Sequence, residues 1–315
     1  MPDLVTGVNL PWLEYGQDFG ACAWRPEGGV SSPRGLERMQ RALARVAASG
    51  ARLVRWWLQG DGRSGLREDA AGRVLSLDDR VFPDMDAAMA ALRATGLRAV
   101  FVLCDFLWFA APRLVRGVQL GGRRQVLRDP SLREALLHEV YAPIAERYGT
   151  EDAIAAWDLC NEPEWATLAV GTLDPRRSLS RREMRGFLAA LARVFREGAR
   201  QPLTVGLASA RSLPLVRGLE LDFYQVHWYE HVDSFATLAR PVARLGLDRP
   251  LMLGEFPTLG CSVPPSVILE TAAAAGYSSA LAWSSCSDDK ASSPDACQAA
   301  LLRWAARAQG DTAGA

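Results

Sequence analysis

The feature that most constrains this fold is a regular alternation of short apolar segments with amphipathic helical segments. Eight apolar segments have the length of buried strands, at residues 5–10, 53–58, 98–103, 154–159, 203–207, 223–227, 251–254 and 279–283. Each is followed by a helical pattern, and such alternation favours a parallel sheet. Eight repeats without an edge signal predict closure of this α/β chain into a (β/α)8 TIM barrel.

The helical signals between these segments are apolar residues spaced three and four apart. The first helix is expected to begin at Pro33, after a Ser32 cap, and to end at Gly50; another is capped near Ser180. The remaining helices are predicted over 84–95, 131–148, 212–218, 234–245, 264–275 and 295–308. Long loops follow three strands, at 59–83, 104–130 and 163–179. They build out the carboxyl-terminal face, which holds the active site in such barrels.

The chain is predicted to form a single domain. Its 315 residues fit one barrel, a fold that takes about 250 residues or more. No linker or low-complexity segment interrupts residues 1–310, which we assign to the barrel, and residues 311–315 form a small polar tail. The rival fold, a doubly wound open sheet, would carry a G-x-G-x-x-G fingerprint after the first strand, and that fingerprint is absent.

Charge and composition exclude several kinds of partner. The chain has 36 basic and 36 acidic residues, so neither nucleic acid nor an acidic membrane is expected to bind it. The N-terminus shows no secretory signal, and no apolar run approaches the roughly 20 residues of a membrane span. The six cysteines lack C-x-x-C spacing and favour buried thiols, although Cys261 and Cys286 could form a bridge. We expect a cytoplasmic monomer that acts on an uncharged substrate without a metal or other cofactor.

Two glutamates stand where apolar strands end. Glu162 follows the fourth strand in A-A-W-D-L-C-N-E-P, and Glu255 follows the seventh in L-M-L-G-E-F-P. Partial burial at a strand end disfavours the charged carboxylate and raises its pKa toward neutrality, which suits a proton donor. Two carboxyl groups at the ends of two buried strands are the groups that glycosidic bond cleavage requires.

The other strand ends carry polar and aromatic side chains. His227 and Tyr229 are two residues apart, so both point to the same face if the strand reaches them. Aromatic rings stack on the apolar faces of sugars, and planar polar groups bind the hydroxyls. The strand ends therefore predict a carbohydrate-binding cleft. Its expected members are Arg55, Asn161, His227, Tyr229, Trp283, Trp12, Trp57, Asp105, Trp108 and Trp165.

These motifs resemble those of the retaining β-glycosidases of glycoside hydrolase clan A, most closely family 5, the cellulase and mannanase family. The resemblance spans all eight predicted strands, from G-V-N-L-P-W to A-L-A-W-S. N-E-P and G-E-F are its most specific parts, supported by V-R in the second strand and H-W-Y in the sixth. The resemblance implies hydrolysis of a β-linked glucoside, mannoside or oligosaccharide by double displacement.

The resemblance also implies roles for the residues at the cleft. Glu162 is the general acid/base and Glu255 is the nucleophile. The supporting residues are Asn161 on the sugar 2-hydroxyl, Arg55 and Tyr229 on Glu255, His227 beside the acid/base, and Trp283 as the floor of the subsite. Many family members carry histidine where this chain has Asp105. The peptide bond after Trp283 is expected to be cis.

A retaining mechanism makes two physical predictions about the carboxyl groups. They should lie about 5–5.5 Å apart, because an inverting pair is separated by roughly 6.5–9.5 Å to admit a water molecule. Their environments should also differ. We expect Arg55 and hydrogen bonds to keep Glu255 charged, while burial and the charge of Glu255 raise the pKa of Glu162.

Two other classes of protein remain open from the residues alone. A non-catalytic carbohydrate-binding barrel would keep the aromatic residues but usually lose one carboxylate. A metal-dependent barrel hydrolase would use clustered histidines and carboxylates. This chain has only three histidines and no H-x-H after the first strand, and it has both glutamates. The sequence therefore favours the glycoside hydrolase.

Overall fold

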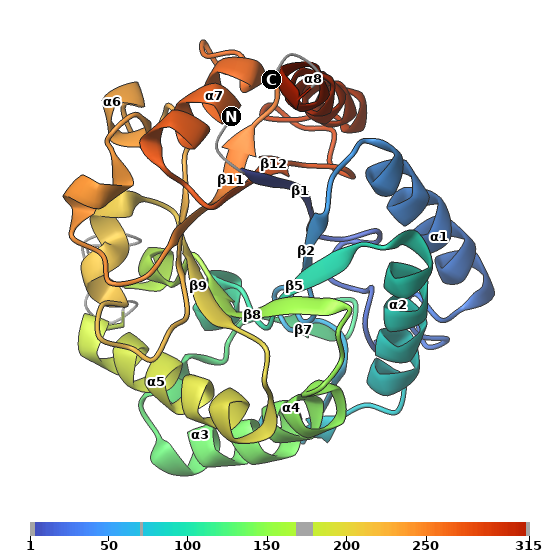
Figure 1. Cartoon of the computed structure of the whole chain (residues 1–315). Coiled ribbons are helices and arrows are strands. Elements are labelled where there is room, and N and C mark those ends of the chain that lie inside the picture. The colour runs from blue at the N-terminus through green and yellow to red at the C-terminus, as the bar shows by residue number, and fades with distance from the viewer. Residues whose placement is uncertain (1–3, 70–71, 168–178, 313–315) are drawn as a thin grey trace.

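The computed structural model describes residues 4–69, 72–167 and 179–312, and its central feature is a closed barrel of parallel strands. Figure 1 looks into this barrel. Its strands, in order around the barrel, are β1 (Val5–Leu10), β2 (Leu53–Trp57), β5 (Arg98–Val102), β8 (Ile154–Asn161), β9 (Leu203–Leu207), β10 (Tyr224–His227), β11 (Leu251–Pro257) and β12 (Ser279–Trp283), which pairs with β1. The predicted TIM barrel is confirmed.

The barrel is surrounded by helices. The longest are α1 (Pro33–Ala48), α2 (Val81–Thr95), α5 (Arg181–Gly198), α7 (Pro265–Ala275) and α8 (Pro294–Thr312). Of these, α1 and α5 begin at the predicted caps, and α2 begins at Val81, three residues before its predicted start. The Ser32 hydroxyl accepts a hydrogen bond from the backbone of Gly35, and Ser180 forms a reciprocal capping box with Glu183. Helix α8 continues past its predicted end, so residues 311 and 312 are helical rather than part of a tail; residues 313–315 lie outside the described chain.

Two predicted helices are interrupted in the structure. The helix over 131–148 consists of α3 (Pro130–Leu136), a π-helical turn (Leu137–Tyr141) and α4 (Ala142–Tyr148). Pro143 in the first turn of α4 has no backbone N–H to donate to the preceding turn, which explains the wider turn before it. The helix over 234–245 is two short pieces, α6 (Phe235–Leu238) and a 3₁₀ turn (Val242–Leu245), because Pro241 stands between them.

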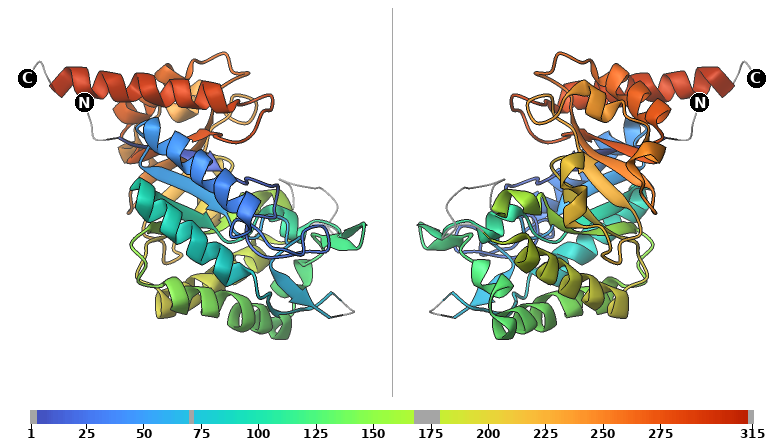
Figure 2. Two further views of the ribbon diagram at one scale, coloured as in Figure 1. Left: turned by 90° about the vertical axis from the view of Figure 1, so that its right-hand side faces the viewer. Right: turned by 90° about the vertical axis from the view of Figure 1, so that its left-hand side faces the viewer.

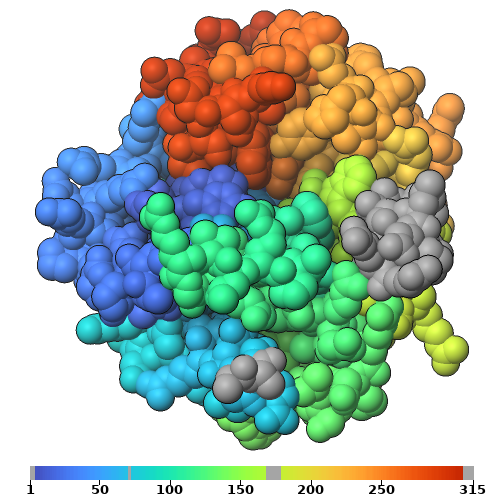
Figure 3. Space-filling view, turned by 180° about the vertical axis from the view of Figure 1, so that it is seen from behind, coloured from blue at the N-terminus to red at the C-terminus, as the bar shows by residue number. Residues whose placement is uncertain are grey.

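The loops at the carboxyl ends of the strands contain structure that the sequence did not predict. Two small hairpins pair β3 (Leu66–Glu68) with β4 (Val74–Leu77), and β6 (Arg113–Val115) with β7 (Val118–Leu120). They project beyond the end of the barrel opposite the two termini (Figure 2). Figure 3 shows this face, with the β1–α1 loop in blue, the segment after β5 in green and the chain after β11 in orange to red. Much of the third predicted loop, residues 168–178, lies outside the described chain.

The barrel interior changes from apolar to polar along its axis. A small cluster of Val100, Ala156, Met252 and Leu281 fills one layer. Above it, toward the carboxyl ends of the strands, Arg55 is fully buried and contacts residues of three other strands. The polar layer therefore lies directly beneath the expected active site. All six cysteines are free, and none of the described helices is long and apolar enough to cross a membrane.

Candidate active site

Glu162 is presented by an irregular strand end. The pairing of β8 with β9 shifts register between Asp158 and Asn161, and such a bulge re-aims the side chains that follow it. Glu162 comes next, with φ 47° and ψ 47°, a left-handed conformation that is uncommon outside glycine. Its side chain is 17% exposed, accepts a hydrogen bond from the Trp165 indole at 3.1 Å, and places Oε1 2.8 Å from His227 Nδ1. One edge of the carboxyl group is thus open to a substrate.

Glu255 lies in β11, where the pairing with β10 also shifts register, so that it stands opposite His227. Its Oε1 pairs with the Arg55 guanidinium at 2.7 Å, and its Oε2 accepts a hydrogen bond from the Tyr229 hydroxyl at 2.8 Å. Burial raises the pKa of Tyr229 well above its ordinary value, so this phenol stays a hydrogen-bond donor. Both predicted contacts of Glu255 are present in the structure.

His227 brings the two carboxyl groups together. Its Nδ1 lies 2.8 Å from Glu162 Oε1 and 3.6 Å from Glu255 Oε1. The side-chain atoms that the three residues turn toward one another all lie within 4.8 Å. One oxygen of Glu162 and one of Glu255 therefore lie somewhat closer than the predicted spacing of about 5–5.5 Å, and well within the roughly 6.5 Å or more of an inverting pair.

Burial controls the proton affinities of these groups. It raises the pKa of Glu162 from 4.5 to about 7 and lowers the pKa of His227 from 6.5 to about 4. Burial also raises the pKa of Glu255, against the opposing effects of His227, Arg55 and Tyr229. The two pKa values are therefore both raised, rather than driven apart as the sequence led us to expect. The direct ion pair with Arg55 still favours Glu255 as the carboxyl group that ionises first, because no arginine or lysine among the described residues pairs directly with Glu162.

Asn161 and Asp105 extend the polar network toward the cleft. The Asn161 carbonyl oxygen accepts a hydrogen bond from Arg55 at 2.7 Å, and its amide donates to Asp105 Oδ2 at 2.8 Å. Burial raises the pKa of Asp105 to about 7. These contacts fix the orientation of the Asn161 amide and leave one of its N–H groups for a ligand.

The cleft above the carboxyl groups has a volume of about 600 Å³ and is lined by aromatic rings together with polar and aliphatic side chains. Trp283 meets Trp12 and Trp57 edge to face, with ring centroids 6.3 Å and 6.2 Å away. The peptide bond between Trp283 and Ser284 is cis, as predicted. The predicted cleft residues that line it are Trp12, Trp57, Asp105, Asn161, Glu162, Trp165, Tyr229, Glu255 and Trp283.

Three predicted substrate-binding residues do not reach the cleft. Trp108 is fully buried: its ring packs 6.4 Å from the ring of Tyr141, and its indole donates to a backbone carbonyl in the core. Its assignment to the cleft was wrong, because a tryptophan after a strand can equally turn toward the core. Arg55 and His227 are also buried, so they hold the two glutamates rather than touch a substrate.

Several site residues were not predicted. Tyr15 and Lys290 line the cleft from loops, and no motif marked them. Asp158 and Gln225 lie beneath it, with exposed fractions of 0%, and both contact the network around Arg55 and His227. A signal for these two was present, because each is a polar residue inside an otherwise apolar strand.

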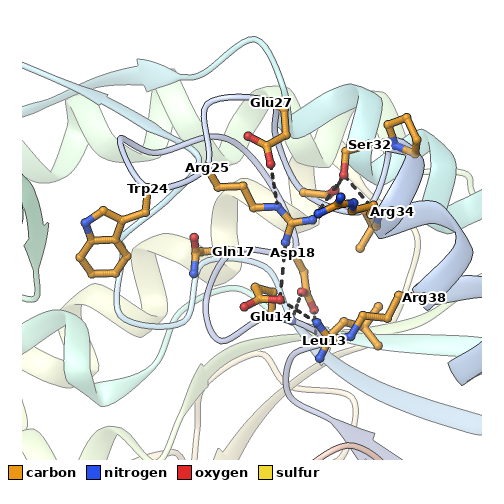
Figure 4. A pocket seen from close by; sticks show the side chains of 14 residues that line it. Leu13, Glu14, Gln17, Asp18, Trp24, Arg25, Glu27, Ser32, Arg34 and Arg38 are labelled. Carbon is orange, nitrogen blue, oxygen red and sulfur yellow. Dashed lines mark hydrogen bonds and ion pairs between the residues drawn. The ribbon is translucent and has the colours of Figure 1, made fainter.

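A second hollow, of about 740 Å³, lies between the β1–α1 loop and α1 (Figure 4). Arg25 reaches across it, 3.9 Å from Glu14, 3.8 Å from Glu27 and 3.3 Å from the Ser32 hydroxyl. Glu14 also pairs with Arg38 at 2.6 Å. Glu14, Glu27, Arg25 and Arg38 of this hollow are thus within ion-pair distance of one another, whereas the carboxyl groups of the cleft converge on an open space.

Among the described residues, Glu162, His227 and Glu255 form a group whose atoms are close enough to hold a metal ion. The donor set does not favour one. Arg55 already places a positive charge 2.7 Å from Glu255 Oε1, and that charge would repel a bound cation. The arrangement is suited instead to acid–base and nucleophilic chemistry, in which the two carboxyl groups act on a ligand bound in the cleft.

The chain resembles known proteins in sequence and in fold. No protein-family model matches the chain. Its sequence is 24% identical over 327 residues to mannan endo-1,4-beta-mannosidase of Mytilus edulis, an alignment that covers 89% of this chain and 83% of the relative. The chain is thus a distant homologue of a β-mannanase over nearly its whole length, in agreement with the resemblance to the mannanases of family 5.

Solved structures show the same fold. Endo-1,4-beta-mannanase from Eisenia fetida superposes with a TM-score of 0.80 at 20% identity, covering 95% of this chain and 90% of the other. A GH5_18 protein from Bifidobacterium longum superposes with a TM-score of 0.67 at 13% identity, covering 97% of this chain and 79% of the other. These likenesses show that the chain shares its fold with both proteins.

Proposed function

We propose that this protein is a retaining glycoside hydrolase that cleaves β-1,4-linked mannan within the chain, with Glu162 as acid/base and Glu255 as nucleophile. One observation carries the proposal: two glutamates at the ends of β8 and β11 converge on the same histidine nitrogen, at 2.8 Å and 3.6 Å. The choice of mannan rests on the relatives, which are described as mannanases.

In the first step Glu162 gives its proton to the glycosidic oxygen while Glu255 attacks the anomeric carbon. The pKa of Glu162, raised to about 7 by burial, keeps the carboxyl group protonated near neutral pH. The attacking oxygen of Glu255 needs its negative charge, and Arg55 stabilises that charge in the free enzyme. The products of this step are a released sugar and a covalent glycosyl ester on Glu255.

In the second step Glu162, now ionised, takes a proton from water as that water attacks the anomeric carbon. The bond to Glu255 breaks, and both carboxyl groups return to their starting states. Two displacements at one carbon restore its original configuration. The remaining N–H of Asn161 is placed to bind a sugar hydroxyl, and Trp283 offers a face on which a sugar ring can stack.

The test is hydrolysis of soluble β-1,4-mannan, followed by product sizing. The proposal predicts a fall in viscosity well before the release of reducing ends is complete, because cleavage is internal. Soluble β-glucan is the matched comparison. Hydrolysis of β-glucan without hydrolysis of mannan would retain the mechanism and overturn the substrate, and activity on no β-glycoside would overturn both.

A further inference from the structure

Beneath the two catalytic carboxyl groups lies a row of three buried polar side chains. Asp158 on β8, Gln225 on β10 and His227 at the end of β10 have exposed fractions of 0%, 0% and 1%. Gln225 Nε2 lies 3.0 Å from Asp158 Oδ2 and 3.5 Å from His227 Nε2. The row ends at Glu162, which is 2.8 Å from the other nitrogen of His227. The chemistry described above assigns no part to Gln225.

The orientation of the Gln225 amide is determined by Asp158. That carboxylate forms an ion pair with Arg55 at 2.8 Å, so it carries a negative charge. If the amide oxygen faced this carboxylate, two acceptors would oppose each other at hydrogen-bond distance in a buried site. The amide nitrogen must therefore face Asp158. The opposite atom, Gln225 Oε1, has no hydrogen-bond partner among the described residues.

Two glycines hold the Gln225 side chain in this place. A Cβ atom at Gly206 would lie 2.6 Å from Gln225 Nε2, and one at Gly254 would lie 2.6 Å from both Gln225 Cγ and Nε2. Contacts that short do not occur, so both positions need glycine for the amide to fit. Because backbone closes on it from both neighbouring strands, the amide has little room to turn away from Asp158.

The amide in turn determines the tautomer of His227. A neutral imidazole carries one N–H, on either Nδ1 or Nε2. With the Gln225 N–H group directed toward Nε2, a proton on Nε2 would place two donors face to face. Even at 3.5 Å this contact favours Nε2 as an acceptor, so the N–H is on Nδ1. Nδ1 then donates a hydrogen bond to Glu162, rather than accepting a hydrogen bond from the protonated carboxyl group.

We propose that Gln225 is a positioning residue that holds His227 in the Nδ1–H tautomer, so that His227 donates a hydrogen bond to Glu162 in every step of the reaction. This inference rests on the proposed function of Glu162. When Glu162 gives its proton to the leaving group, the donated hydrogen bond stabilises the carboxylate that remains, and it is already in place before the transfer. The proton later returns from water to Glu162, and His227 keeps its own proton throughout.

The charged groups around His227 are compatible with a neutral imidazole ring. Arg55 faces it from β2, Asp158 and Glu162 from β8 and its end, and Glu255 from β11. The negative groups favour an imidazolium, and Arg55 and burial oppose it. Burial dominates and lowers the pKa of His227 to about 4, so the question at neutral pH is which nitrogen bears the single proton.

Nitrogen NMR of histidine-labelled protein tests the tautomer directly. The chain has three histidines, so the variants H138Q and H231Q leave the signals of His227 identified. The wild-type protein at pH 7 should show a protonated Nδ1 and an unprotonated Nε2 for His227. A protonated Nε2 would overturn the proposal. This measurement needs no substrate, so it stands even if the protein fails to hydrolyse mannan.

The variant Q225M tests the consequence for catalysis. Methionine fills a similar volume without an N–H, so His227 can shift its proton to Nε2 and accept from Glu162, which stabilises the protonated acid. The pH at which kcat/KM declines on the alkaline side should rise by roughly one unit. The kcat should fall about tenfold, and KM should change little. Both effects have the size expected for the loss of one hydrogen bond to a charged group. A folded Q225M with an unmoved alkaline limb would contradict the proposal.

The variant Q201M is the matched control. Gln201 is also a buried glutamine, but its amide donates to the backbone of Tyr148 at 2.8 Å, away from the catalytic groups. Q201M should lose stability and leave the pH profile unchanged. An equal shift of the alkaline limb in Q201M would show that the shift reports loosened packing, and would overturn the role of Gln225. If Q225M does not fold, the wild-type NMR measurement decides.

Discussion

The cleft and the hollow of Figure 4 are two polar cavities at the same end of the barrel, and the larger one is the less suited to chemistry. In the hollow Glu14 pairs with Arg38 and approaches Arg25, Glu27 also approaches Arg25, and both glutamates are about half exposed or more. The third acidic group there, Asp18, is buried and accepts hydrogen bonds from the Trp56 indole and from the backbone of Leu13 and Glu14. In the cleft Glu255 is buried and pairs with Arg55, whereas Glu162 is 17% exposed and its carboxyl group contacts His227 and the Trp165 indole. What distinguishes the cleft is that two buried or largely buried carboxyl groups lie close together and face an open space, so cavity volume is a poor guide to reactivity.

Of all the changes to the two cavities, removing the nucleophile Glu255 from the cleft should reduce activity most. E255A is expected to reduce kcat on mannan by at least about 10⁴-fold, because it removes the oxygen that forms the covalent bond to the sugar. Added azide should restore slow cleavage of an aryl glycoside and give a product of inverted configuration. The circular dichroism spectrum should stay that of a folded barrel. Loss of less than tenfold in a folded E255A would remove Glu255 from the mechanism.

Removing the acid should have the next largest effect and should depend on pH. Activity of the wild type requires protonated Glu162, so it should decline as the pH rises through about 7, the pKa of that group. E162Q should reduce turnover of mannan by about 10²–10⁴-fold, less for an aryl glycoside whose leaving group needs no proton. Its remaining activity should lack the alkaline limb. If the activity of E162Q still declined above pH 7, the decline would be due to another group, and Glu162 would not be the acid that sets the pH profile.

The same variant should be more stable than the wild type at high pH. Burial raises the pKa of Glu162 from 4.5 to about 7, so the folded protein holds the proton more tightly than the unfolded chain. Stability is therefore lost as the pH rises from about 4.5 to 7 and stays lost above it. At pH 8 the free energy of unfolding of E162Q should exceed that of the wild type by roughly 2 kcal/mol, and the two should agree near pH 4. Urea unfolding of the two proteins at pH 8 and at pH 4 measures these free energies. The same stability difference between E162Q and the wild type at both pH values would contradict the prediction.

The smallest effect is expected in the hollow. E14Q removes the carboxylate that pairs with Arg38, but both partners are about half exposed, and such pairs contribute about 1 kcal/mol or less. The free energy of unfolding and kcat/KM on mannan should both stay close to wild type. If E14Q lost as much activity as E162Q, the hollow would contribute to catalysis, and the distinction drawn between the two cavities would be wrong.

The sequence predicted the barrel and both glutamates because those signals are local. Alternating apolar strands and helices define the fold, and a glutamate at the end of an apolar strand needs no knowledge of distant residues. Trp108 could not be placed in this way, because only packing against Tyr141 decides that its ring faces the core. The hairpin β3–β4 was missed because its strands are short and lie in a polar, glycine-rich loop.

The buried layer beneath the site was harder to predict for a different reason. Asp158 and Asn161 are three residues apart, so a regular strand would turn them to opposite faces. The register shift between them lets both contact Arg55. A bulge of this kind depends on the neighbouring strand, and nothing in the spacing of residues along one strand reveals it.

Proton NMR of the first-formed sugar tests the central claim most directly. Hydrolysis of a soluble β-1,4-mannooligosaccharide would be followed from its first minutes, before the new reducing end equilibrates between its two anomers. Two displacements, with Glu255 as nucleophile and Glu162 as acid and then base, predict that the β anomer appears first and the α anomer grows in later. An α anomer that appears first would show a single displacement by water and would contradict the assignment of Glu255 as nucleophile.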